Sequence, residues 1–228
     1  DAVGKLNLLQ PEFVLSVGDF IEGYTEDEVA LDRMWNEFEG MTDQLQMPFF
    51  YLPGNHDDTN ETMLRKWRQR FGRPYYHFVY QDVLFLVLDS EDPPRGHESS
   101  NFSPEQLDYF RAVLKKNTGN RWTMIFVHKP MWETEHPGWL EFEKMVADRD
   151  YTVFAGHAHA YTLTHRLDKK YVRLGITGGV LPAPVPETEL PDAITWITMT
   201  DQGPVLANIL LRGILDEKTP PPVTAGPK

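Results

Sequence analysis

The run Gly54-Asn55-His56-Asp57 offers an amide oxygen, an imidazole and a carboxylate in three consecutive residues. It follows directly on residues 48–52, an apolar segment with the composition of a buried strand. All three side chains are donors to metal ions, and α/β proteins build their sites at the carboxyl ends of strands. The run therefore predicts chemistry at the end of a strand.

Oxygen and imidazole side chains also follow three other apolar segments of the chain. They are Asp19, His128, and the pair His157 and His159. A single Asp or His at such a point often serves only a turn or a helix cap. Together with Asn55, however, these residues predict a metal site. Because the sequence has no cysteine to supply sulfur, the donors suit Mn, Fe or Zn better than Ca or Cu(I).

The elements that must position these residues alternate between strands and helices. Apolar runs predict strands over residues 12–17, 48–52, 75–80, 83–89, 122–127 and 151–155. Apolar residues at helical spacing predict helices over residues 3–9, 26–45, 63–72 and 139–146. One more helix starts at Ser103, where Pro104 fits the first helical position and Gln106 can complete a capping box.

After residue 160 the pattern changes to hairpins. One is predicted over residues 161–176, with its turn at Asp168-Lys169, and another over residues 193–211. Strands that alternate with helices and then continue as hairpins indicate an α/β protein with a mixed sheet and helices outside it.

The totals exclude several classes of protein. The 228 residues fit one large domain. With 22 basic and 34 acidic residues the net charge is −12, which argues against a nucleic-acid-binding surface. The longest apolar runs, about six residues, are far shorter than a membrane-spanning helix requires. We therefore expect a soluble protein, either cytoplasmic or exported.

The four motifs together resemble those of the calcineurin-like metallophosphoesterases. Gly18-Asp19, Gly54-Asn55-His56-Asp57, His128 and Gly156-His157-Ala158-His159 match four of the five sequence blocks of that family, in the same order. The resemblance implies an α/β fold in which two mixed β-sheets form a sandwich flanked by α-helices. That domain would cover residues 1–215, followed by a Pro-rich extended tail over residues 216–228.

The resemblance also implies a set of metal ligands. Asp19 would bridge two divalent ions, with Mn, Fe and Zn as the candidates. Asn55, His128 and His157 would complete one site, and His159 would contribute to the other.

Two further residues would take part in catalysis if the resemblance holds. His56 would face the leaving group, and Asp57 would balance the charge on the His56 ring. The implied function is hydrolysis of a small phosphate mono- or diester by attack of a metal-bound hydroxide. Residues 91–100 and 132–138 are the predicted walls of the substrate site.

One block of the family is missing from this sequence. The family opens with a strand that ends in Asp-x-His, whereas this chain begins Asp1-Ala2-Val3. We therefore expect an upstream strand beside residues 13–17 that supplies the remaining ligands of the second metal. The missing block also motivates an alternative, a metal-binding scaffold of the same fold with little or no catalysis. A metal-dependent amidohydrolase is disfavoured, because those barrel enzymes have no counterpart of Gly54-Asn55-His56-Asp57.

Overall fold

The computed structural model describes residues 1–94, 96, 100–178 and 192–214, so the predicted tail over residues 216–228 lies outside the described residues. A six-stranded mixed sheet is the central feature, with the strand order β3-β4-β5-β6-β8-β7. Its strands are β3 (Tyr76–Tyr80), β4 (Val83–Leu88), β5 (Trp122–Val127), β6 (Tyr151–Ala155), β7 (Thr162–Arg166) and β8 (Lys169–Arg173).

The middle of this sheet is parallel and its two edges are antiparallel. Strands β4, β5, β6 and β8 run in one direction, while β3 and β7 run against their neighbours. Every residue of β4 and of β6 is buried, as expected for parallel strands covered on both faces. The predictions of strands over residues 122–127 and 151–155 are confirmed without a shift.

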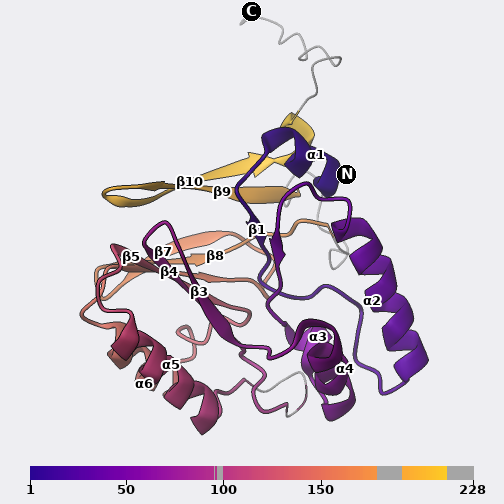
Figure 1. Cartoon of the computed structure of the whole chain (residues 1–228), viewed down its shortest axis with the longest axis horizontal. Coiled ribbons are helices and arrows are strands. Elements are labelled where there is room, and N and C mark those ends of the chain that lie inside the picture. The colour runs from indigo at the N-terminus through magenta and orange to yellow at the C-terminus, as the bar shows by residue number, and fades with distance from the viewer. Residues whose placement is uncertain (95, 97–99, 179–191, 215–228) are drawn as a thin grey trace, which may run out of the picture.

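Alternate residues of β4 face two different hydrophobic cores, because successive side chains of a strand point to opposite faces. The two sets are Leu84, Leu86 and Leu88 on one face and Val83, Phe85 and Val87 on the other. The first core packs against α5 (Pro104–Lys116) and α6 (Pro137–Val146). Figure 1 shows these two helices on one side of the sheet. The strands outside this sheet, described next, lie on the other side.

The remaining strands form two separate pairs. Strands β1 (Val14–Leu15) and β2 (Phe49–Phe50) are parallel, and β9 (Ala193–Thr200) and β10 (Gly203–Leu210) are antiparallel. The other elements are α1 (Ala2–Leu9), α2 (Glu28–Thr42), α3 (Asn55–Asp58), α4 (Glu61–Phe71) and the short 3-10 helix η1 (Leu211–Gly213). The α/β class is confirmed, with the second sheet divided into these two pairs. No helix within the described ranges is long and apolar enough to cross a membrane.

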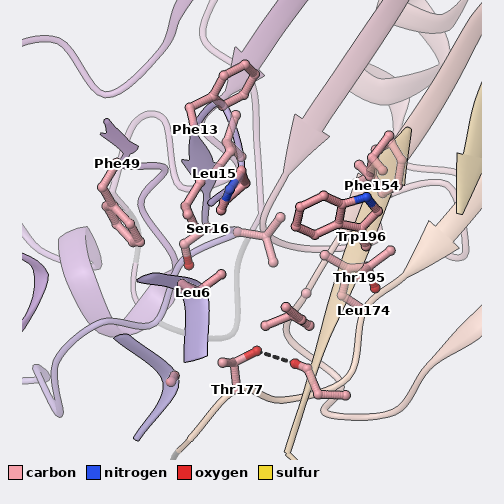
Figure 2. A pocket seen from close by; sticks show the side chains of 18 of the residues that line it. Leu6, Phe13, Leu15, Ser16, Phe49, Phe154, Leu174, Thr177, Thr195 and Trp196 are labelled. Atoms are coloured by element: carbon pink, nitrogen blue, oxygen red, sulfur yellow. Dashed lines mark hydrogen bonds between the residues drawn. The ribbon is translucent and has the colours of Figure 1, made fainter. Parts of the chain in front are cut away.

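A large apolar slot lies between the two pairs, with a volume of about 1870 Å³. Figure 2 shows Phe13 and Leu15 on one side of it and Leu174 and Trp196 on the other. In the described part of the chain, β1 has only β2 as a hydrogen-bonded neighbour. The strand predicted over residues 12–17 is reduced to Val14–Leu15, because its ladder with β2 contains only the pairs Val14–Phe49 and Leu15–Phe50.

The start of α5 is confirmed with one difference from the predicted capping box. The Ser103 hydroxyl accepts the N–H of Gln106 at 3.1 Å, as expected of an N-cap. The Gln106 side chain, however, turns to the backbone of Asp89 and makes two bonds of 2.9 Å, one to its N–H and one to its carbonyl. The glutamine thereby ties this helix to the end of β4.

The turn of the hairpin over residues 161–176 was predicted one residue too late. Strands β7 and β8 are joined through Leu167 and Asp168, whose φ angles are 52° and 59°. A two-residue hairpin turn of this kind requires positive φ at both central positions, which the pairing of Arg166 with Lys169 imposes on these two residues.

A buried carboxylate links α6 to the edge of the six-stranded sheet. Glu143 accepts hydrogen bonds from the Arg166 Nε at 2.8 Å and the Tyr171 hydroxyl at 2.6 Å. The indole N–H of Trp139 donates to the same carboxylate at 3.3 Å. Three donors from three elements therefore depend on one acceptor.

We predict that Glu143→Leu lowers the free energy of unfolding by about 3 kcal/mol, because it leaves buried donors without an acceptor. The matched control is Glu141→Gln on the same helix, since Glu141 pairs with Arg111 in solvent, where both side chains are about half exposed. That change should cost less than about 1 kcal/mol. Urea unfolding of both variants tests this, and equal losses would contradict it.

Candidate metal centre

Four polar side chains converge at the carboxyl ends of four strands. Asp19 follows β1, Asn55 follows β2, His128 follows β5 and His157 follows β6. Around the Nε2 atom of His128 lie the Asn55 Oδ1 at 2.9 Å, the Asp19 Oδ2 at 3.2 Å and the His157 Nδ1 at 3.2 Å. One donor atom each from Asp19, His128 and His157 lies within 4.8 Å of the others.

The protonation of His128 shows what this cluster can hold. Its Nδ1 lies 2.6 Å from the carbonyl oxygen of Val17, which can only accept, so Nδ1 carries a hydrogen. In the neutral ring, Nε2 then carries a lone pair that faces the oxygens of Asp19 and Asn55. Electron-pair donors at these distances repel one another unless a positive charge lies among them. Two oxygens and two ring nitrogens suit a borderline divalent cation.

The titration behaviour agrees with a demand for positive charge at this point. Burial lowers the pKa of His128, but the hydrogen bond and charge of Asp19 outweigh it and leave the pKa raised. Burial raises the pKa of Asp19, and the bond to His128 more than reverses this, to about 2. Desolvation of its ring and the charge of His128 lower the pKa of His157 to about 4, which leaves that ring neutral and able to bind a metal.

The loops that carry these ligands have unusual backbone conformations. Asp19, His157 and His159 have φ angles of 62°, 68° and 57°, in the left-handed region. Such conformations cluster at functional sites, where the surrounding structure must hold them. The loops after β1 and β2 also approach each other closely at Gly54. Glycine is required there, because a Cβ atom would lie 2.3 Å from the Asp19 Oδ1.

Asp57 makes its hydrogen bonds to the backbone of two loops. Its fully buried carboxylate accepts the backbone N–H groups of Asp19 at 2.7 Å, Phe20 at 2.9 Å and Gly54 at 2.8 Å. It therefore joins the loop after β1 to the loop after β2, and no hydrogen bond between it and the His56 ring is present. Burial, followed by the charge of Asp19, raises the pKa of Asp57 to about 7.

The partners of His56 come from a loop that the sequence did not single out. The Nδ1 of His56 lies 2.8 Å from the carbonyl oxygen of Glu22, so Nδ1 carries a hydrogen and Nε2 is the nitrogen left for other contacts. The Tyr24 ring lies 4.3 Å from the His56 ring, centroid to centroid. Neither residue belongs to a recognisable motif, and a loop contact of this kind has no periodicity to reveal it.

His159 lies apart from the other four predicted ligands. It lines the slot between β1 and β9, two residues beyond His157, and is not in the cluster around His128. A site that used His159 would therefore be a second one, adjoining the first through Asp19, which lines the same slot.

In the predicted substrate wall over residues 132–138, Trp132 and His136 make contacts within the protein. Trp132 is buried against Trp139 and Tyr171. The His136 side chain caps α6 by accepting the N–H of Gly138 at 3.2 Å. In the other predicted wall, residues 95 and 97–99 lie outside the described ranges.

Comparisons with known proteins show which proteins this chain is similar to. Purple acid phosphatase 19 of Arabidopsis thaliana is 26% identical over 204 residues, which cover 83% of this chain and 45% of the relative. A probable glycerophosphodiester phosphodiesterase of Arcobacter nitrofigilis is 23% identical over 124 residues, which cover 53% of this chain and 42% of the relative. This chain thus spans less than half the length of these curated relatives.

A solved structure shares the fold. The crystal structure of a dimetal phosphatase from Danio rerio superposes with a TM-score of 0.60 at 17% identity, covering 77% of this chain and 76% of that one. The sequence model described as calcineurin-like phosphoesterase matches residues 2–161. Since that match covers more than half of the 228 residues, the chain belongs to the calcineurin-like phosphoesterase family.

Proposed function

We propose that this protein is a metal-dependent hydrolase of phosphate mono- or diesters. The observation that carries the proposal is the convergence of Asp19, Asn55 and His157 around the Nε2 atom of His128. The relatives named above include a phosphatase and a probable phosphodiesterase, which supports both ester classes.

Asp19, Asn55, His128 and His157 would hold one divalent ion, and Asp19 with His159 would contribute to a second. Bound divalent ions supply a nucleophile at neutral pH and neutralise charge on the phosphoryl oxygens. The net charge of −12 supports this assignment, because an anionic substrate would need such ions to approach an acidic protein. Mn, Fe and Zn are the candidates by donor type.

His56 would assist departure of the leaving group. Its Nδ1 donates to the Glu22 carbonyl, so a proton on Nε2 makes the ring an imidazolium with one N–H available to the leaving oxygen. The ring is partly exposed, which leaves it accessible to a substrate. Asp57 would act indirectly, by fixing the backbone of Asp19.

A second candidate function is a metal-binding scaffold with little or no catalysis. The observation that favours it is the incomplete second ligand set, which has only Asp19 and His159 among the predicted ligands. A two-ligand site completed by water binds a metal weakly. Hydrolysis of phosphate esters by the metal-loaded protein distinguishes the two candidates.

We further propose that one additional strand completes the domain and the second metal site. The slot beside β1 supports this, because its volume of about 1870 Å³ exceeds that of an ordinary ligand pocket. Its walls are largely apolar, and one end reaches Asp19, His157 and His159. A strand that entered beside β1 would use the edge of β1 opposite β2, where no described strand pairs, and could end at these residues.

The metal site is tested by replacing one ligand. His128→Ala should reduce the affinity for Mn²⁺ or Zn²⁺ by about tenfold or more, because even partners of the ligands cost that much when removed. His165→Ala, which changes an exposed histidine on β7, should leave the affinity unchanged. Metal titration followed by elemental analysis provides the measurement, and equal metal content in all three proteins would refute the assignment.

The role of His56 is tested with two leaving groups. General acid catalysis contributes about 10²–10⁴-fold, and least where the leaving group is already good. His56→Ala should therefore slow hydrolysis of alkyl phosphate esters more than that of nitrophenyl phosphate esters, at saturating Mn²⁺. Equal losses on both substrates would show that His56 is a ligand or has a purely structural role.

The additional strand is tested by metal stoichiometry. Residues 1–228 should bind one divalent ion tightly, whereas the natural protein isolated from its source should hold two per chain. Elemental analysis with intact mass measurement of both proteins gives the comparison. Two tightly bound ions in residues 1–228 alone would overturn the proposal.

A further inference from the structure

Tyr24 touches two residues of the proposed site at once. It lies in the loop between β1 and α2, and its hydroxyl is hydrogen-bonded to the amide nitrogen of Asn55. Its ring packs on the His56 ring, with centroids 4.3 Å apart and planes inclined by 51°. The residue as a whole is 44% exposed.

The backbone of this loop is shaped to hold Tyr24 in place. Gly23 and Tyr24 have φ angles of 62° and 51°, and a non-glycine residue rarely adopts the second value. A Cβ atom on Gly23 would lie 1.7 Å from the His56 carbonyl oxygen, so only glycine fits there. The preceding residue, Glu22, receives the Nδ1–H of the same histidine at 2.8 Å. Residues 22–24 therefore wrap around His56, and a strained conformation kept in this way indicates a functional constraint.

The contact with Asn55 has a specific chemical consequence. A carboxamide offers an oxygen and an NH₂ group of nearly the same shape, but only the oxygen can bind a metal ion. In Asn55 the oxygen points at the cluster, 2.9 Å from the His128 Nε2, and the NH₂ group points at Tyr24. Because Asn55 is only 4% exposed, its NH₂ group depends on a protein partner, and the tyrosine oxygen provides it.

We propose that Tyr24 is a positioning residue of this metal centre, which holds the Asn55 oxygen towards the metal through its hydroxyl and orients His56 through its ring. The inference deepens the proposed function and rests on it for the role of His56. The role towards Asn55 concerns metal binding alone. The two parts of the side chain therefore have separable effects.

Two substitutions separate these effects. Tyr24→Phe removes the hydroxyl and keeps the ring, so the affinity for Mn²⁺ should fall by about tenfold, as is typical for a partner of a metal ligand. At saturating Mn²⁺ this variant should recover the wild-type kcat. Tyr24→Ala also removes the ring, and it should keep a reduced kcat at saturating Mn²⁺, with a larger loss on alkyl than on nitrophenyl phosphate esters.

The matched control is Tyr80→Phe. Tyr80 is also a partly exposed tyrosine. Its hydroxyl donates to Glu12 at 2.7 Å and accepts from the Gln81 side chain at 3.0 Å, away from the cluster. This variant should bind Mn²⁺ as the wild type does. Thermal melting of the metal-free proteins checks that each variant is folded.

Calorimetric titration with Mn²⁺ is the deciding measurement, and it does not require activity. An unchanged affinity in Tyr24→Phe would overturn the role towards Asn55, and equal losses of Tyr24→Ala on both ester types would overturn the role towards His56. If the wild type binds Mn²⁺ but hydrolyses no ester, the proposed function fails, while a weaker affinity in Tyr24→Phe would still support the contact with Asn55.

Discussion

The buried carboxylate of Asp57 is the contact on which the geometry of the candidate metal centre depends. It accepts N–H groups from Asp19 and Phe20 in one loop and from Gly54 in another. The strands that precede these loops, β1 and β2, are only two residues long each, so their own pairing fixes the loops weakly. One acceptor with donors from both loops supplies the constraint that the short ladder lacks, because a buried donor left without a partner is costly.

The opposite side of the centre is rigid for a different reason. His128 and His157 follow β5 and β6, two neighbouring parallel strands of the six-stranded sheet. The residues of these two strands are almost entirely buried. The backbone N–H of Gly156 donates to the carbonyl of His128 at 2.9 Å and fixes the two ends relative to each other. The ring of His128 then reaches across to Val17, so the sheet and the smaller β1–β2 pair meet at this histidine.

This arrangement sets the electrostatics of the site. The Nδ1–H of His128 donates to the Val17 carbonyl. The lone pairs of the His128 Nε2, the Asp19 Oδ2 and the Asn55 Oδ1 therefore face one another. Taking such groups out of water without a compensating charge is unfavourable. The raised pKa of His128 and the lowered pKa of Asp19 express the same demand for positive charge between them. A folded backbone that forces these atoms together is therefore already biased towards cations.

The sequence by itself determined the strands of the central sheet and marked the candidate donors. Apolar runs marked β5 and β6 to the residue, because strands buried on both faces must be apolar throughout. Polar residues directly after apolar runs made Asn55, His128 and His157 candidate donors, because strand ends are where a loop can present them. The tertiary structure alone decided the contacts of Asp57 with Asp19 and of Tyr24 with Asn55, since these partners are 38 and 31 residues apart in the chain. It also decided that the predicted strand over residues 12–17 would be short, because the length of a ladder depends on the partner segment, here Phe49–Phe50, as well as on the strand's own composition.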